Sequence, residues 1–535
     1  MDKNHCSFSQ LPFSRLFQTY TQDFSRVKNF FVTNPFSDTE IKQRVSRIPQ
    51  TNNREQVISA LKSYHKKLGI STIQQQQIEK FSNPNALVIV TGQQLGIYGG
   101  PLYTVFKTIT AIVLANEWEK KLNVPVIPIF WLADEDHDFE EITSVGIPSY
   151  LGKQAIKLKE HGSNIPVSEE LITSSFDVLN EEISKAIQET EFSDALWEML
   201  HKCYRIANTH GTSFAQLICS WFADAGVLIA GSNHKKIKIL LKSIFSTSVT
   251  KVDSIKNVLD HQSMLVKKQF HRQVMVGDTN LFMLGENGRS KFHLDQSNWV
   301  VDGVFFTKDQ LLSLINSKPE RFSPNVFLRP VIQDVLLPTI GYVAGPGELG
   351  YFAQMKPYYE EFGMEMPVIF PRLSATLLES SVTRIMEKLP FEMCNYNLRI
   401  EDLESKYIAM NSNLNIEKIF KKWIENLHIV SENPISNIQG IDSSLKGVSG
   451  KLMSVLENDI NKLKGRVFKS LKQQENTQLK RIARIKEHVF PDGLQERVIS
   501  PIYFMNKYGL DIWNKIITTF IKDDLDLSKH YVIKL

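Results

Sequence analysis

The chain has 535 residues, of which 42% are hydrophobic and 22% are charged. These proportions are ordinary for a soluble globular protein, and the length predicts about two to four domains. The formal net charge, 62 − 58 = +4, is too close to balance for nucleic acid or an anionic membrane to be the main partner. No apolar run approaches the roughly 18 to 20 residues of a membrane-spanning helix.

Cysteine content and the start of the chain bear on the cellular compartment. The four cysteines (Cys6, Cys203, Cys219 and Cys394) are scattered and form no CxxC pair. This pattern is typical of a reducing compartment and argues against a disulfide framework or a structural zinc site. The first residues lack the apolar core of a signal peptide. We therefore expect a cytoplasmic protein without zinc.

Residues 1 to about 80 are expected to be mostly helical. Ile41–Leu68 carries apolar residues at helical spacing, and the pattern of Ser71–Lys80 predicts a short polar helix. Periodic helices of this kind usually pack against a neighbouring layer, so we assign this region a structural role.

The stretch from Ala86 to Glu141 organises the rest of the chain. A β-branched run (Ala86–Val90) is followed by a glycine-rich turn (Thr91–Pro101), a helix (Leu102–Glu119) and a second apolar run (Val124–Leu132). This succession predicts two parallel strands joined by a right-handed helical crossover. The turn, and the acidic cluster that follows the second strand, would then lie at the carboxyl ends of neighbouring strands, where open α/β sheets bind ligands.

Three further strands are expected in the same α/β core: Val227–Ala230, Thr339–Ala344 and Pro367–Arg372. More polar segments between them read as insertions, the second with a helix near Lys235–Leu265 and β-like runs at Gln273–Leu284 and Trp299–Thr307. The expected organisation is, in chain order: N-terminal helices and first part of the core (1–145), first insertion (146–200), core continued (201–232), second insertion (233–325), core completed (326–376), α-helical coiled coil (377–490), and a tail packing on the core (491–535).

From about Leu377 the pattern changes to one typical of a long antiparallel helical hairpin. Apolar residues recur at steps of three and four within Ile400–Val430 and from Leu445 to about Ile485, with Lys, Glu, Asn and Gln between them. The break near Ser431–Pro434 is expected to supply the turn. Such a hairpin either protrudes or pairs with another subunit. The aromatic residues after Pro491 need burial, so the tail is expected to return to the core.

The glycine-rich turn has two interpretations. It can be a tight connection between strand and helix, or a backbone that approaches a nucleotide or phosphate, with the N-terminus of the Leu102 helix facing the anion. Neither GxGxxG nor a Walker motif is present. The polar residues Gln93, Gln94, Tyr98 and Tyr103 favour binding. The expected cofactor-binding residues are Thr91, Gly92, Gln93, Gln94, Gly99, Gly100 and Pro101.

The cluster Asp134-Glu-Asp-His-Asp138 directly follows a buried strand. It can be a solvated loop, but its first residues should lie at the sheet edge. His137 between Asp136 and Asp138 has the partners that a general base needs. Mg²⁺ or Mn²⁺ is a further alternative, although no second His lies at ligand spacing.

A third polar group surrounds the strand Thr339–Ala344. Arg329, Gln333 and Asp334 precede it, and Gly345-Pro-Gly-Glu348 follows it. Arg and Gln suit carboxylate or phosphate recognition, and the alternative is an ion pair between core helices. Arg372, after the next strand, can neutralise an anion or cap a helix.

Three motifs together resemble the BshC family of cysteine-adding enzymes in bacillithiol biosynthesis: Thr91–Thr104, Phe130–Glu141 and Arg329–Tyr351. The resemblance covers essentially the whole chain. It implies a Rossmann-type core related to nucleotidyltransferases and class I aminoacyl-tRNA synthetases, two connecting-peptide insertions, and a coiled coil that forms a homodimer. The HIGH and KMSKS signatures of class I synthetases are not present.

The resemblance also implies a reaction, in which L-cysteine is joined to the amine of glucosaminyl-malate through an activated carboxyl group. ATP is the expected activator, bound at the glycine-rich turn; the role of Mg²⁺ stays open and no metal ligand is assigned. His137 is the first candidate for the base, with Asp134 and Asp136 as the other catalytic residues. The expected substrate-binding residues are Asp138, Arg329, Gln333, Asp334, Gly345, Gly347, Glu348, Tyr351 and Arg372.

Two alternatives remain at this point. One is another adenylating or nucleotidyl-transferring enzyme that acts on a different amine or acid. The other is a non-catalytic nucleotide-binding scaffold that dimerises through its coiled coil. The convergence of polar groups at strand ends favours an enzyme.

Overall fold

The computed structural model describes residues 2–49, 53–149, 152–285, 288–296, 298–411 and 416–535. The chain forms two compact units. The first combines Met1–Leu378 with Asp492–Leu535, and the second is Glu379–Pro491. Parts of the helices expected over 41–68 and 400–430 fall on residues 50–52 and 412–415, which lie outside the described residues.

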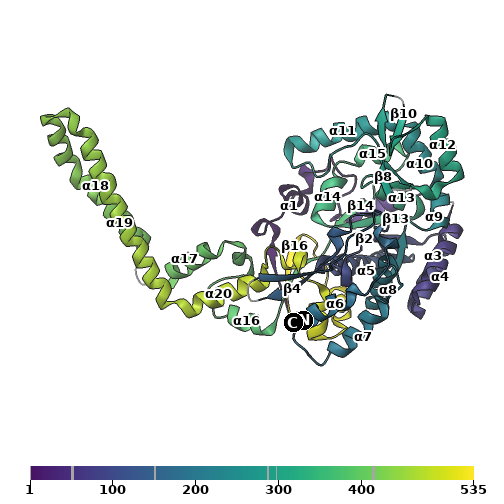
Figure 1. Cartoon of the computed structure of the whole chain (residues 1–535), viewed down its shortest axis with the longest axis horizontal. Coiled ribbons are helices and arrows are strands. Elements are labelled where there is room, and N and C mark those ends of the chain that lie inside the picture. The colour runs from purple at the N-terminus through teal and green to yellow at the C-terminus, as the bar shows by residue number, and fades with distance from the viewer. Residues whose placement is uncertain (1, 50–52, 150–151, 286–287, 297, 412–415) are drawn as a thin grey trace. The chain divides into compact units, whose positions relative to one another are not determined.

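A five-stranded parallel sheet forms the centre of the first unit (Figure 1). The order in space is β14-β13-β2-β3-β6. Read from β6, and numbered by their order along the chain, these strands have the order 3-2-1-4-5, which is the Rossmann arrangement. The chain reverses direction across the sheet between β2 and β13, and ligands bind at such a point. The strands are β2 (Leu87–Gln93), β3 (Val126–Leu132), β6 (Leu228–Gly231), β13 (Thr339–Ala344) and β14 (Val368–Pro371).

Both faces of the sheet are covered, which explains its continuous apolar strands. Alternate residues of one strand enter different hydrophobic clusters: Ile129 and Trp131 face one side, and Phe130 and Leu132 the other. The crossover helix α5 (Leu102–Leu122) ends at Asn123, whose φ of 54° is left-handed. The first cluster also contains side chains of the N-terminal helices α1 (Arg15–Gln22), α3 (Arg54–Leu68) and α4 (Thr72–Lys80). The helix α2 (Asp38–Val45) precedes α3.

Two insertions interrupt the core. The first holds the hairpin β4 (Ser144–Ser149) and β5 (Gly152–Lys157) with the helices α6 (Ser175–Ala186) and α7 (Ser193–Cys203), and α8 (His210–Trp221) then leads to β6. In the second, the single helix expected near Lys235–Leu265 is three helices: α9 (Lys235–Leu240), α10 (Lys242–Thr250) and α11 (Val252–Gln269). It continues with β7 (Leu281–Gly285), β8 (Gly288–Lys291), β9 (His293–Asp295), β10 (Asn298–Val301), β11 (Val304–Phe306), α12 (Lys308–Ser317) and β12 (Phe322–Pro324). The helix α13 (Leu328–Leu336) then precedes β13, and α14 (Pro346–Phe352) and α15 (Lys356–Glu361) follow it.

The expected return of the tail to the core is confirmed. The strand β16 (Lys529–Lys534) pairs with β15 (Ser374–Leu378) on one side and with β1 (Lys3–Ser7) on the other. This second sheet was not expected, because the first 80 residues read as helical. Three helices of the tail precede β16: α21 (Gln495–Val498), α22 (Pro501–Tyr508) and α23 (Ile512–Lys522).

The second unit is helical. Its hairpin consists of α18 (Ile416–Ile441) and α19 (Lys446–Gln474). The ion pair Glu417–Lys464 and the contact of His428 with Glu457 mark their antiparallel register. The prediction of a turn at Ser431–Pro434 is wrong, because α18 continues through Pro434 and the chain reverses after Asp442. A proline removes one helical hydrogen bond, which a long helix packed along a partner tolerates. The remaining helices are α16 (Ser380–Met386), α17 (Ile400–Asn411) and α20 (Asn476–Val489).

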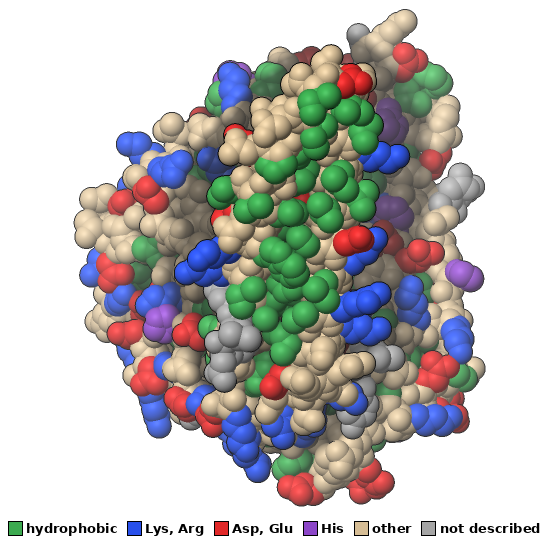
Figure 2. Space-filling view, turned by 90° about the vertical axis from the view of Figure 1, so that its left-hand side faces the viewer, with side chains coloured by type: hydrophobic (Ala, Val, Ile, Leu, Met, Phe, Trp, Pro, Cys, Tyr) green, Lys and Arg blue, Asp and Glu red, His purple; other side chains and the backbone are tan. Residues whose placement is uncertain are grey.

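Hydrophobic side chains of the hairpin gather in a band (Figure 2). Several are largely exposed, among them Val430 at 73%, Val448 at 65% and Leu452 at 57%. A monomeric soluble protein rarely exposes so many large apolar side chains together. Within the described residues, no helix is both long enough and apolar enough to cross a membrane.

Candidate active site

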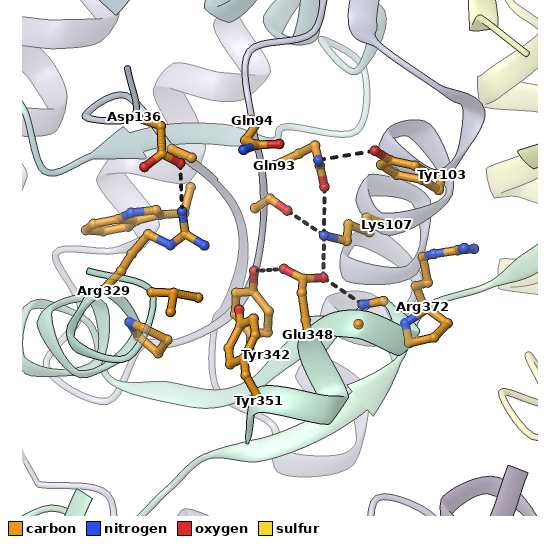
Figure 3. A pocket seen from close by; sticks show the side chains of 18 of the residues that line it. Gln93, Gln94, Tyr103, Lys107, Asp136, Arg329, Tyr342, Glu348, Tyr351 and Arg372 are labelled. Carbon is orange, nitrogen blue, oxygen red and sulfur yellow. Dashed lines mark hydrogen bonds and ion pairs between the residues drawn. The ribbon is translucent and has the colours of Figure 1, made fainter. Parts of the chain in front are cut away.

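A cavity of about 600 Å³ opens at the carboxyl ends of β2, β3 and β13, within the first unit (Figure 3). This is the reversal point of the sheet, where the order of strands predicts a ligand site. The volume is within the range of small-molecule sites. Residues from segments far apart in the chain line it, among them Gly92, Gln93, Gln94, Tyr103, Lys107, Trp131, Asp134, Glu135, Asp136, Gln273, Arg329, Gln333, Tyr342, Gly345, Gly347, Glu348, Tyr351, Arg372 and Arg497.

Lys107 of α5 lies at the centre of the lining (Figure 3). Its ammonium group donates to the carbonyl of Gly92 at 2.8 Å and to Oε1 of Gln93 at 2.9 Å, and it forms an ion pair with Glu348. Burial lowers the pKa of Lys107 and Glu348 opposes that shift. A lysine was not expected here, although it interrupts the apolar sequence of α5, and that interruption is the signal that could have indicated it.

Gly92 lines the cavity and has no room for a side chain. A Cβ at this position would lie 2.6 Å from the carbonyl oxygen of Trp131 and 3.4 Å from the Tyr342 hydroxyl. The indole Nε1 of Trp131 is buried and has no hydrogen-bond partner among the described residues. The close approach of β2 to β3 therefore requires glycine at this position.

Asp134 and Glu135 follow β3 and are both buried. Asp134 accepts from the backbone amide of Asn233 at 3.2 Å through Oδ2, while its Oδ1 has no partner in the described part of the chain. Burial, and then the charge of Glu135, raise the pKa of Asp134 to about 7. Glu135 is neutralised by Lys238 and also accepts from Ser232. Asp134 is therefore an acid that exchanges its proton near neutral pH.

Asp136 lies between two arginines. Arg329 is 3.4 Å from Oδ2 and Arg289 is 3.7 Å from Oδ1. Arg289 also donates to Nδ1 of His137 at 3.3 Å. Because a guanidinium group cannot accept, Nδ1 of His137 must be the unprotonated nitrogen, and its lone pair faces Arg289. His137 and Asp138 are not part of the cavity lining, and Asp138 is exposed.

Arg372 follows β14 and is held by the tail. It makes a bidentate pair with Glu496, at 2.9 and 2.7 Å, and both side chains are buried. Burial would raise the pKa of Glu496, but Arg372 holds it below its ordinary value. Arg497 of the same tail segment lines the cavity and is exposed. The sequence predicts that this tail packs on the core, and it gives no sign of a contribution to the site.

The later part of the glycine-rich turn lies away from the cavity. Gly99 packs on Trp221, where a Cβ would come within 2.4 Å of the indole ring, although the φ of 87° also requires glycine. The first amide of α5, on Leu102, donates to the carbonyl of Ile499 at 2.9 Å. Thr91 is buried and donates to the Val343 carbonyl. None of Thr91, Gly99, Gly100 and Pro101 lines the cavity, which agrees with the tight-connection alternative for this part of the turn.

The turn after β13 is also satisfied internally. Glu348 accepts from the Gly345 amide at 2.7 Å and from the Tyr342 hydroxyl at 2.7 Å. Gly345, Gly347, Glu348 and Tyr351 line the cavity, and so does Gln333. Asp334 does not; it accepts from the Tyr359 hydroxyl at 2.7 Å, and burial raises its pKa to about 6.

The structure thus brings most of the expected residues to one cavity and leaves others outside it. The sequence gives no site role to five residues of the lining, Lys107, Trp131, Glu135, Tyr342 and Arg497. It gives none to Arg289 either, which contacts Asp136 and His137. Among the described residues, no group of three or more His, Cys, Asp and Glu side chains could hold a metal ion.

Comparisons with known proteins agree with this layout. The model described as “Bacillithiol biosynthesis BshC, N-terminal Rossmann-like domain” matches residues 1–373. The model described as “Bacillithiol biosynthesis BshC, C-terminal coiled-coil domain” matches residues 375–535. The Rossmann-like core and the helical coiled-coil region expected from the sequence are therefore confirmed.

Curated relatives match over nearly their whole length. A protein of Salinibacter ruber named “Putative cysteine ligase BshC” is 30% identical over 516 residues, covering 93% of this chain and 92% of the relative. Proteins of the same name from Halalkalibacterium halodurans and Chloroherpeton thalassium are 29% and 28% identical, each over 98% of this chain. Because the two domain models together match almost every residue, the chain belongs to the BshC family.

Proposed function

We propose that this protein is a ligase that joins the carboxyl group of L-cysteine to the amine of glucosaminyl-malate, forming an amide and so bacillithiol. One observation carries the proposal. The three motifs on which the resemblance to BshC rests come together at a single cavity, at the reversal point of a Rossmann-type sheet. The names of the relatives support a cysteine ligase as the class of enzyme.

Amide formation from a free carboxylate requires activation, and ATP is the proposed donor. The cavity offers donors and cations suited to an oxyanion: Gln93, Trp131 and Arg497, with Arg329 beside Asp136. ATP would supply a leaving group on the cysteine carboxyl carbon. The side chains of this chain would orient that carboxyl group and exclude water from it.

Asp134 is the proposed general base, in place of His137. The amine nitrogen attacks the activated carbonyl carbon, the C–N bond forms, the leaving group departs, and the proton of the amine passes to Oδ1 of Asp134. Asp134 lines the cavity, and its Oδ1 is buried and has no partner in the described chain. The lone pair of Nδ1 of His137, by contrast, faces Arg289. Asp136, held between two arginines, would orient Arg329 toward a carboxylate.

The hairpin is the proposed dimer contact, and the cytoplasm the proposed compartment. The exposed apolar band on α18 and α19 supports self-association, since its burial is worth about 25 cal/mol for each Å². The substrates are small molecules, and neither nucleic acid nor membrane is a proposed partner.

The test is direct assay of the purified full chain. Protein is incubated with cysteine, glucosaminyl-malate and ATP, and the amide product is measured by mass spectrometry, with other amino sugars as competitors. We expect product only with cysteine and glucosaminyl-malate. Product with another amine or acid instead would favour a different adenylating enzyme. In cells, deletion of the gene should abolish bacillithiol and lead to accumulation of glucosaminyl-malate. If a copy that carries Asp134→Asn restored bacillithiol fully in the deletion strain, a non-catalytic scaffold would be favoured.

A further inference from the structure

Lys107 lines the cavity but has no donor left for a ligand. A lysine ammonium group carries three N–H donors and no acceptor. All three are used, by the Gly92 carbonyl, by Oε1 of Gln93 and by the carboxylate of Glu348. The side chain is only 3% exposed. Lys107 can therefore act on a ligand only through the groups that it holds.

The group that faces the cavity is the amide of Gln93. Because the ammonium group only donates, the amide oxygen of Gln93 must be the atom that faces Lys107. The amide nitrogen then points away, toward the hydroxyl of Tyr103 at 3.4 Å (Figure 3). An amide nitrogen has two N–H donors, and the hydroxyl accounts for one. The end of β2 therefore presents a hydrogen-bond donor, and not an acceptor, to the cavity.

Other residues that line the cavity also carry hydrogen-bond donors or positive charge. Trp131 is one of them, and its Nε1 is a buried donor without a partner among the described residues. Arg372 lies with its guanidinium 5.7 Å from the Tyr103 ring, but its charge is matched by Glu496. For Arg497, no ion pair is present within the described chain. Donors and an unmatched cation fit a ligand oxygen that carries negative charge.

We propose that Lys107 is a positioning residue, which holds the amide oxygen of Gln93 so that the end of β2 donates to an oxyanion of the ligand, either a carboxylate or a phosphoryl oxygen. Arg497 supplies the opposite charge. The inference rests on the proposed function in that it concerns the same cavity. It goes beyond it by stating the chemistry of the ligand group at one position.

The test compares three variants of the full chain: Gln93→Glu, Gln93→Met, and the charge-neutral pair Lys107→Met with Glu348→Gln. Gln93→Glu keeps an oxygen facing Lys107 but turns a second oxygen toward the ligand. Gln93→Met removes the donor and adds no acceptor. The paired variant frees the amide of Gln93 without leaving Glu348 buried and unmatched. Gln154→Glu, exposed on β5, is the matched control for amide-to-acid replacement.

Binding is measured by calorimetry with two probes, glucosaminyl-malate for carboxylates and ATP for phosphoryl groups. We expect Gln93→Met to weaken one probe by about tenfold to a hundredfold, the range for a lost hydrogen bond to a charged group. Gln93→Glu loses the same bond and adds a like charge, so it should weaken that probe further. The paired variant should raise the KM for that substrate more than it lowers kcat. The probe that is affected identifies the oxyanion, and thermal unfolding checks that each variant is folded.

The inference is overturned if Gln93→Glu binds both probes as tightly as Gln93→Met or the unchanged protein does, because Gln93 would then be an acceptor or make no contact. Binding of neither probe by the unchanged protein overturns it as well. If the expected order of variants is found but no amide forms from cysteine and glucosaminyl-malate, the proposed function fails and the inference stands.

Discussion

Arg372 donates to both carboxylate oxygens of Glu496, at 2.9 and 2.7 Å, and this pair connects the tail to the carboxyl end of β14. Glu496 also accepts from the hydroxyl of Ser374 and from the amide of Ala375 at 2.9 Å. A buried pair of this kind is costly to break, because the remaining charge has no compensation.

Replacement of Glu496 by Gln should therefore destabilise the first unit by about 3 to 5 kcal/mol. Chemical denaturation monitored by tryptophan fluorescence measures the loss. The double change Arg372→Met with Glu496→Met removes both charges and is expected to be less harmful than Glu496→Gln alone. Equal stability of Glu496→Gln and the unchanged protein would mean that the pair contributes nothing.

The pH dependence of the proposed reaction should report Asp134. Its pKa is raised to about 7 by burial and by Glu135, so the carboxylate that can accept a proton is formed as the pH rises through 7. We expect kcat/KM to increase from pH 6 to pH 8 and then level off. Asp134→Asn should lower kcat by about 10²-fold to 10⁴-fold and remove the rise of kcat/KM with pH. If the variant shows the same rise, Asp134 is excluded as its source.

The same substitution should stabilise the fold at neutral and higher pH. Asp134 binds its proton more tightly in the folded protein than in the unfolded chain, so its contribution to stability falls as the pH rises from about 4 to 7. Asn removes this cost while it can keep accepting from the Asn233 amide. Thermal unfolding of Asp134→Asn at pH 8 is expected to show a higher Tm than that of the unchanged protein, and at pH 4 the two should be similar.

Buried histidines should make the fold sensitive to acid. Burial lowers the pKa of His65, His210 and His530 to about 4 in each case. The unfolded chain then binds more protons between pH 6.5 and pH 4, so stability is lost as the pH falls through this range. In His530→Gln, which can still bond to Ser374 and Thr376, this loss should be smaller. Urea unfolding at pH 7 and pH 5 measures it, and an identical loss in both proteins would contradict the assignment.

The exposed band of the hairpin leads to a prediction about assembly. Val448→Asp with Leu452→Asp places two charges in the band and should convert a dimer into a monomer, because unpaired charges are costly at an apolar contact. Light scattering of the full chain measures the mass. Asn458→Asp, an exposed position on the same helix, is the control and should leave the mass unchanged. A monomeric unchanged protein would contradict the proposed contact.

How far the sequence predicts the structure depends on the range of the interactions. The core strands were identified because apolar runs such as Val88–Val90 record burial in the local sequence. The pairing of β16 with β1 and β15 joins the two ends of the chain and leaves no local signal. The hairpin turn was misplaced because Pro434 is a frequent helix breaker, whereas the long partner helix decides its conformation here.

The sequence motifs predicted many of the residues that line the cavity, but not which residues contact one another. Gly92 and Gln93 line the cavity as expected, while Gly99 and Gly100 belong to the packing of α5. His137 was a candidate for the general base because two aspartates flank it in sequence. Its actual partner, Arg289, comes from an insertion about 150 residues away, and no spacing rule reveals such a contact.

The second unit, Glu379–Pro491, is an insertion in the chain of the first unit, whose fold is complete without it. The amide of Leu377 donates to the side chain of Gln495 at 2.8 Å, so the chain leaves the first unit and re-enters it at adjacent points. Insertions between adjacent ends cost little loop-closure entropy, however long they are. A short glycine linker could therefore replace the whole second unit. The proposed catalysis and the proposed self-association would then lie on parts of the chain that can be redesigned independently.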